Sequence, residues 1–170
     1  SSGEETLPVG TGSGFIIDES GIVVTNSHVV FGADELEVRF FDGTRVSGTV
    51  VGLDDPNLLD VAVVQIDLSD GTQVPGVLTL GDSDAIRPGD HVVAIGSALG
   101  EFTNTVTVGM VNAVGRSLGG YGLNTLIQHD ADIWRGNSGG PLLNMQGEVI
   151  GVNSAGMSGN QMSVAAPAEM

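Results

Sequence analysis

The decisive stretch of this chain is Gly136-Asn137-Ser138-Gly139-Gly140-Pro141, a serine set among glycines. Glycine adopts backbone conformations that other residues rarely reach, so the chain can turn sharply here and present amide N–H groups beside the hydroxyl. A serine hydroxyl is a weak nucleophile unless a base removes its proton, a third group orients that base, and donors stabilise the oxyanion. Ser138 is therefore a candidate nucleophile, provided that the chain also supplies a histidine and a carboxylate.

Both partners are present, in an informative order. His28 follows an apolar run and lies in the segment Thr-Asn-Ser-His-Val-Val, and Asp60 directly precedes a second apolar run. Asp54 and Asp55 lie nearby, but they precede a proline and are typical of a turn. The order His28, Asp60, Ser138 is that of chymotrypsin-type proteases and differs from the subtilisin and α/β-hydrolase orders. The three groups together predict a catalytic triad.

The chain resembles the protease domain of the HtrA/DegP-like serine proteases along most of its length. The matching segments follow the family's order and are residues 12–17, 25–30, 60–63, 81–84, 94–97, 105–109, 136–143 and 149–153. The resemblance implies a serine endopeptidase that cleaves unfolded or misfolded polypeptides in protein quality control and stress response. It also implies that His28 is the general base, Asp60 orients it and Ser138 is the nucleophile. The oxyanion hole is then expected within Gly136, Asn137 and Ser138, with the Gly136 and Ser138 amides as donors.

Two positions depart from the family pattern. The family usually has Asn-Pro before Gly-Asn-Ser, whereas Trp134 and Arg135 stand there in this chain. Proline would fix one backbone angle, so we expect a loop with more conformational freedom. This keeps open an alternative function, a catalytically inactive or resting-state domain that binds peptides or acts as a scaffold.

The second departure concerns the specificity pocket, which the resemblance assigns to Asp132, Ile133, Asn153, Ser154, Ala155 and Val164. Apolar lining favours cleavage after small or medium aliphatic residues. Asp132, however, lies six residues before Ser138, where trypsin-like enzymes place the carboxylate that selects Arg or Lys. The family usually has a small apolar residue there, so aliphatic and basic preferences both remain open.

Short alternating apolar segments and frequent glycines predict an all-β fold. Strands are expected at residues 13–17, 22–25, 35–40, 45–53, 61–66, 91–95, 103–114, 125–128, 140–143, 148–153 and 161–166, with a helical turn at 26–31. The segment 61–66 is nearly all apolar, so we expect it to be buried on both sides.

We predict a trypsin-like double antiparallel β-barrel that forms one protease domain over residues 1–170. The N-terminal barrel is expected at about 7–70, a connection rich in Gly, Pro and Asp at 71–89, and the C-terminal barrel at 90–170. Because His28 and Asp60 come from the first half and Ser138 from the second, the catalytic cleft should lie between the barrels.

The composition narrows the partners. The net charge is −16 and all five basic residues are arginines, so nucleic acid and anionic membrane surfaces should be repelled. No segment has the roughly 20 apolar residues that a membrane span needs, so no membrane insertion is expected. There is no cysteine, so no disulfide supports the fold. The expected partners are unfolded polypeptide substrates and, from the resemblance, two further copies in a homotrimer.

Neither a cofactor nor a metal is expected. Asp82 and Asp84 share a loop, but two carboxylates are too few for a calcium site. The neighbours His129 and Asp130 could pass for a second dyad, but we expect them to line or support the cleft. Residues 1–5 do not resemble a signal peptide. We therefore expect an excised mature domain. The resemblance implies an extracytoplasmic location, in the periplasm or the cell envelope or secreted, with the signal or anchor region and the family's PDZ domain absent from this chain.

Overall fold

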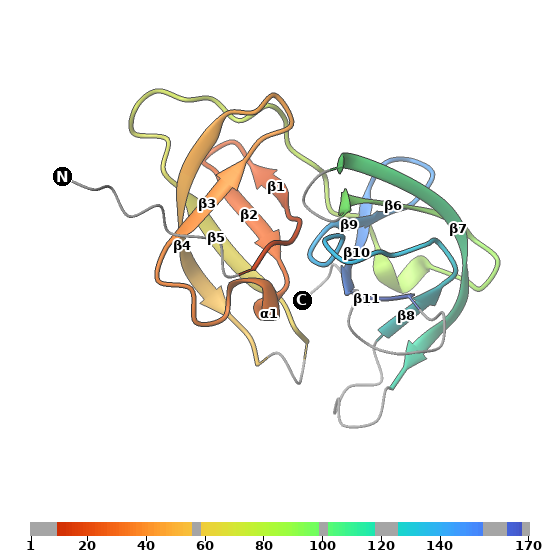
Figure 1. Ribbon diagram of the computed structural model, residues 1–170. Coiled ribbons are helices and arrows are strands. Elements are labelled where there is room, and N and C mark those ends of the chain that lie inside the picture. The colour runs from red at the N-terminus through yellow and green to blue at the C-terminus, as the bar shows by residue number, and fades with distance from the viewer. Residues whose placement is uncertain (1–9, 56–58, 99–101, 118–125, 155–162, 168–170) are drawn as a thin grey trace.

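The computed structural model describes residues 10–55, 59–98, 102–117, 126–154 and 163–167. The chain forms two β-rich halves that lie side by side, the first drawn from red to yellow and the second from green to blue (Figure 1). The described part contains one α-helical turn and one 3₁₀ turn. The prediction of an all-β, two-part antiparallel architecture is confirmed.

The first half is a five-stranded antiparallel sheet in the order β1-β2-β5-β4-β3. Its strands are β1 (Phe15–Asp18), β2 (Ile22–Thr25), β3 (Leu36–Arg39), β4 (Arg45–Leu53) and β5 (Ala62–Ile66). Among the described residues, the end strands β1 and β3 are not hydrogen-bonded to each other. This half is therefore a sheet among the described residues, where the sequence suggested a barrel.

The second half is a closed barrel in the order β10-β11-β8-β7-β6-β9. Its strands are β6 (His91–Ala98), β7 (Phe102–Arg116), β8 (Leu126–His129), β9 (Pro141–Leu143), β10 (Val149–Ser154) and β11 (Ser163–Pro167). Closure pairs every strand on both sides and so leaves no exposed edge. β9 directly follows the nucleophile segment, and the Gly139 N–H donates to the Asn153 carbonyl of β10 at 2.8 Å, which ties that segment to the barrel wall.

Each half has its own apolar core, and a third cluster joins them. Phe15 and Val24 of the first half pack with Leu143, Val149 and Val152 of the second. Burial of this apolar surface fixes the two halves against each other. Groups from either half can therefore be held at a constant separation.

Strand β5 differs from its prediction. The side chains of Ala62, Val64 and Ile66 are buried, whereas Val63 and Gln65 are only partly buried. Successive side chains of a strand point to opposite faces, so this pattern means that one face of β5 meets the core and the other is partly open. The expectation of burial on both sides was wrong.

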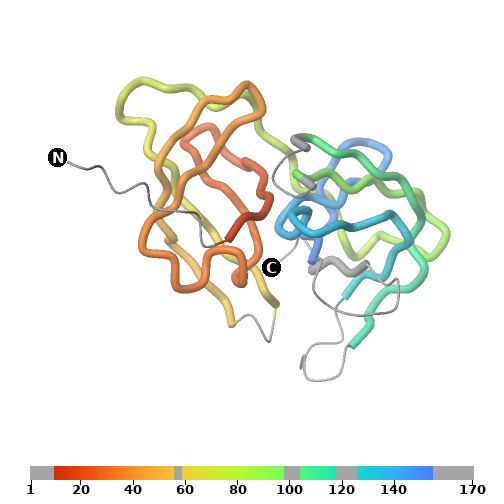
Figure 2. The backbone as a smooth tube through the Cα atoms, viewed as in Figure 1, coloured from red at the N-terminus to blue at the C-terminus, as the bar shows by residue number. Residues whose placement is uncertain are grey.

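Residues 67–90 connect the halves without a strand and contain the 3₁₀ turn η1 (Ser83–Ala85). Figure 2 shows this segment crossing from one half to the other. The Leu78 N–H donates to the Ile16 carbonyl at 2.8 Å, and the Gly81 N–H donates to the Val149 carbonyl at 2.8 Å. The connection is thus hydrogen-bonded to both halves. None of the helices within the described ranges has the length and apolar character to cross a membrane.

Candidate active site

His28 is carried by the short helix α1 (Ser27–Val30), which follows directly after β2. The Phe31 N–H donates to the Ser27 carbonyl at 2.8 Å and closes this single turn. Ser27 and Val30 are buried, whereas 41% of the His28 side chain is exposed. The turn therefore anchors its flanks in the core and presents the imidazole ring to solvent beside the second half.

Asp60 holds His28 at two points. Its Oδ2 lies 2.6 Å from Nδ1 of the His28 ring, and its Oδ1 accepts the His28 backbone N–H at 2.8 Å. Asp60 itself is only 7% exposed. An ionised carboxylate can only accept hydrogen bonds, so Nδ1 carries the ring proton and Nε2 keeps the lone pair of a base. The geometry fixes both the tautomer and the orientation of the ring.

The backbone of Asp60 is strained. Its φ is 56°, in the left-handed region that non-glycine residues rarely occupy. Such a conformation costs about 1–3 kcal/mol and persists only when neighbours impose it. Here the Asp60 carbonyl accepts the Asn26 side-chain amide at 2.9 Å and the Ser27 N–H at 3.1 Å. These bonds tie the carboxylate to the segment that carries His28.

Ser154 reaches the same carboxylate from the second half. Its hydroxyl lies 3.4 Å from Oδ2 of Asp60, a long contact for a hydrogen bond between oxygens. Ser154 is 8% exposed and ends β10. Ser154 is also one of the expected pocket residues, and its hydroxyl is directed at Asp60. Nothing in its spacing from Asp60, 94 positions away, signals this contact.

The turn around Ser138 depends on two left-handed glycines. Gly136 has φ 100° and Gly139 has φ 88°. A Cβ on Gly139 would lie 2.1 Å from the Ser13 carbonyl oxygen and 2.3 Å from Oγ1 of Thr25. The turn therefore packs against the first half, at Ser13 and at Thr25, three residues before His28. Ser138 is 7% exposed, and its carbonyl accepts the Ser13 N–H of the first half at 2.8 Å. Ser138 therefore lies at the seam, the contact surface between the two halves.

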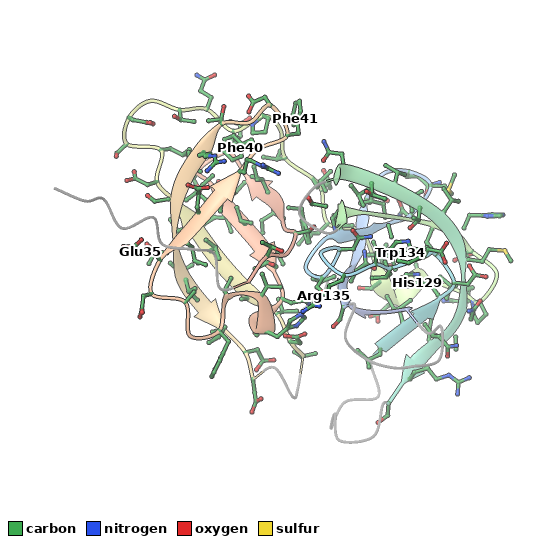
Figure 3. All side chains as sticks on the ribbon, in the orientation of Figure 1. Glu35, Phe40, Phe41, His129, Trp134 and Arg135 are labelled. Atoms are coloured by element: carbon green, nitrogen blue, oxygen red, sulfur yellow. The ribbon has the colours of Figure 1, made fainter. Side chains whose placement is uncertain are left out.

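The amides of this turn are not equivalent. The Asn137 N–H donates to the Trp134 carbonyl at 2.9 Å, and the Asn137 side chain is buried. The Asn137 amide is thus engaged within the loop, and it lies between the amides of Gly136 and Ser138, which the resemblance assigns as the candidate oxyanion donors. Trp134 is 59% exposed, and Arg135 is exposed as well. Figure 3 shows Arg135 where the second half faces the first.

The expected pocket residues are placed unevenly. Asp132 is exposed, and its carbonyl accepts the Thr107 hydroxyl at 2.8 Å. Ile133 is partly buried and packs against the core of the second half. Ala155 lies outside the described residues, and of Val164 the structure gives only its strand pairing with Ser154 and Gln128. The described residues therefore do not distinguish an aliphatic from a basic preference.

Asn153 lies directly behind the nucleophile turn. It is fully buried, its Nδ2 donates to the Pro141 carbonyl at 2.9 Å, and its own carbonyl accepts the Gly139 N–H at 2.8 Å. Its Oδ1 lies 3.2 Å from Nε2 of His129. Asn153 thus braces the backbone that follows Ser138, a role that its sequence position alone did not reveal.

His129 is fully buried at the end of β8. Burial lowers its pKa to about 4, although the hydrogen bond to Asn153 and the charge of Asp130 partly oppose this. The ring is therefore neutral at pH 7. The Asp130 carboxylate accepts the Met110 N–H at 2.6 Å, so the neighbours His129 and Asp130 do not form a dyad.

The predicted loop at Asp82 is a turn. Oδ1 of Asp82 accepts the Asp84 N–H at 2.9 Å and caps η1. Within the described ranges of the chain, no group of three or more histidine, aspartate or glutamate side chains is arranged to hold a metal ion.

Comparison with known proteins adds a second line of evidence. Residues 12–152 match the model of the trypsin-like peptidase domain. The chain is 49% identical over 150 residues to a putative serine protease, HhoB, of Synechocystis, covering 86% of this chain and 34% of that protein. It is 47% identical over 144 residues to a probable periplasmic serine endoprotease, DegP-like, of Hahella chejuensis, covering 85% of this chain and 29% of that one.

Solved structures agree with these matches. The HtrA-type protease AlgW with a decapeptide superposes with a TM-score of 0.82 at 40% identity, over 92% of this chain and 48% of that chain. The same protease with a tripeptide gives a TM-score of 0.80 at 39% identity, over 92% and 52%. The chain spans about a third of the length of the curated relatives it matches.

Proposed function

The chain belongs to the trypsin-like peptidase family, among its HtrA/DegP-like members, and we propose that it is a serine endopeptidase whose triad is His28, Asp60 and Ser138. The observation that carries the proposal is the double contact of Asp60 with His28, at 2.6 and 2.8 Å, beside the buried Ser138 turn. The alternative of an inactive scaffold is not favoured, because the relatives are named as proteases.

The geometry supports an acyl-enzyme mechanism. Nε2 of His28 takes the proton of the Ser138 hydroxyl as Oγ attacks the carbonyl carbon of the scissile bond. The amides of Gly136 and Ser138 stabilise the negative charge that develops on the carbonyl oxygen. The His28 imidazolium, stabilised by the Asp60 carboxylate, then protonates the leaving amine. Water repeats the sequence on the acyl-enzyme and releases the acid product.

The substrate class proposed is unfolded or misfolded polypeptide, which fits a role in protein quality control and stress response. Support comes from two structural neighbours, which are described with a decapeptide and a tripeptide. An extended chain can pair with an exposed strand edge through its backbone, so such binding depends little on sequence. A homotrimer stays a prediction from the resemblance.

We propose an extracytoplasmic location, in the periplasm or the cell envelope or outside the cell. Two relatives are named as periplasmic endoproteases. The absence of cysteine is compatible with such a compartment, because one apolar cluster shared by the two halves joins them without a disulfide.

Labelling with a serine-directed peptide phosphonate, followed by intact-mass measurement, tests the proposal. The wild-type chain should gain one adduct and digest casein, whereas Ser138→Ala should do neither. Ser69→Ala, which changes an exposed serine of the connection, is the matched control and should behave as wild type. Failure of the wild type to react, or labelling that survives in Ser138→Ala, would refute the assignment.

A further inference from the structure

Ser13 makes an unusual set of hydrogen bonds to the nucleophile turn. It precedes β1 in the first half, 123 positions from Gly136. Its hydroxyl donates to the Gly136 carbonyl at 2.7 Å and accepts the Ser97 N–H at 2.8 Å. Its own N–H donates to the Ser138 carbonyl at 2.8 Å. One residue of the first half therefore contacts the turn on both sides of Asn137.

The peptide that joins Gly136 to Asn137 is held at both ends. Its carbonyl accepts the Ser13 hydroxyl at 2.7 Å, and its N–H donates to the Trp134 carbonyl at 2.9 Å. This peptide lies between the two that carry the candidate oxyanion donors, the amides of Gly136 and Ser138. A rotation of the middle peptide would turn the adjoining amides away from their common target.

Local sterics alone do not fix this orientation. Gly136 has φ 100° and no Cβ. Glycine is the residue type with the greatest backbone freedom, so steric repulsion does not hold this conformation. The Asn137 side chain packs against β6 close to Gly96, but within the described part of the chain its Oδ1 and Nδ2 have no hydrogen-bond partner. The bonds that orient the middle peptide are thus those from Ser13 and Trp134.

We infer that the Ser13 hydroxyl is a positioning group for the oxyanion hole, holding the Gly136–Asn137 peptide so that the amides on either side converge. The inference rests on the proposed protease function. It also gives the seam between the halves a chemical role. The first half supplies the base and its carboxylate, and through Ser13 it orders the donors of the second half. An isolated second half would lack this constraint.

The test compares Ser13→Thr with Ser13→Val, which have nearly the same shape and differ in the hydroxyl. Ser13→Thr should keep kcat within about threefold of wild type. Ser13→Val should lose about 10- to 100-fold in kcat with KM changed less than about threefold, because outright loss of one oxyanion donor costs about 10²–10³-fold. Gln65→Met removes other side-chain bonds to carbonyl oxygens, those of Ser20 at 2.7 Å and Ile66 at 3.0 Å in the first half, and should leave kcat unchanged.

A second readout separates positioning from general destabilisation. A peptide boronate mimics the tetrahedral intermediate, so its affinity should fall in Ser13→Val by the same factor as kcat/KM. Binding of an uncleaved peptide, measured with Ser138→Ala added to each variant, should not change. Circular dichroism at the assay temperature verifies folding. Should the larger side chains prevent folding, Ser13→Ala compared with wild type takes their place, with the same expectations as Ser13→Val.

Two different failures remain distinguishable. If the wild type neither digests casein nor reacts with the phosphonate, the proposed protease function is wrong. If the wild type is active and Ser13→Val and Ser13→Thr have equal kcat, only the proposed role of Ser13 is wrong. An equal loss of peptide binding and of boronate binding in Ser13→Val would also overturn it, because a group that acts on the oxyanion donors affects the transition state selectively.

Discussion

Acidification should destabilise the folded chain through His129. The ring is fully buried, and burial lowers its pKa from the ordinary 6.5 to about 4. In the unfolded chain the ring is solvated and binds a proton below about pH 6.5. Between these two values the unfolded state holds one more proton than the folded state. Stability is therefore complete above about pH 6.5 and is lost progressively as the pH falls toward 4.

The magnitude follows from proton linkage. Each pH unit between the two pKa values costs about 1.4 kcal/mol of unfolding free energy. Integrated from about pH 7 to about pH 5, the loss attributable to this ring is about 2 kcal/mol. A loss of that size is a substantial part of the stability of an ordinary domain, which is about 5–15 kcal/mol.

The assay is urea unfolding followed by circular dichroism at about pH 7, 6 and 5, on the wild type and on His129→Gln. Glutamine keeps an amide donor for the Asn153 oxygen but does not titrate. Subtracting the two pH profiles cancels the other titrating groups, and the wild type should lose about 2 kcal/mol more than the variant. Parallel profiles would show that the His129 ring is accessible to protons in the folded state and would refute the reasoning.

Three further predictions concern the site and its supports. Asp60→Asn should lower kcat by about 10⁴-fold, as in other triads, because the His28 ring loses the acceptor that fixes its tautomer; a loss below tenfold in peptide hydrolysis would contradict this. Gly139→Ala should destabilise the chain by more than about 2 kcal/mol, since its Cβ would meet a carbonyl oxygen at 2.1 Å. Gly147→Ala, with φ 79° and open space around it, should cost only about 1–2 kcal/mol in the same urea titration. Arg135 forms no ion pair within the described residues, so its charge is available to attract an acidic substrate. Arg135→Gln should therefore lower kcat/KM about threefold for peptides with acidic residues beside the cleaved bond, and the effect should vanish in about 1 M salt. An unchanged kcat/KM at low salt would contradict this.

Much of the local structure was readable from the sequence. Strands β2 and β4 occupy the predicted residues 22–25 and 45–53, and the helical turn falls within the predicted 26–31. Alternating apolar residues, glycine turns and an Asp-Gly pair between β3 and β4 are local signals, and short-range geometry decides them. The candidate triad was found because its three members stand in recognisable segments.

Other features were invisible for a physical reason. The Ser154 hydroxyl lies against Asp60, and Asn153 braces the nucleophile turn from behind, and neither contact is indicated by the residue's place in the sequence. Such contacts depend on which strands become neighbours in the barrel and on where the side chain ends. The one-sided burial of β5 likewise depends on what packs against each face of the strand. A run of apolar residues does not indicate this.

By itself, the sequence determined the all-β class, the approximate strands, and the three chemical groups proposed for catalysis, because each is encoded within a few consecutive residues. Only the tertiary structure decided how those groups meet. The 2.6 Å contact of His28 with Asp60 and the bond from Ser13 to Gly136 join positions 32 and 123 residues apart. Such distances are set when the apolar seam brings the two halves together, since association of distant segments depends on the packing of the whole chain.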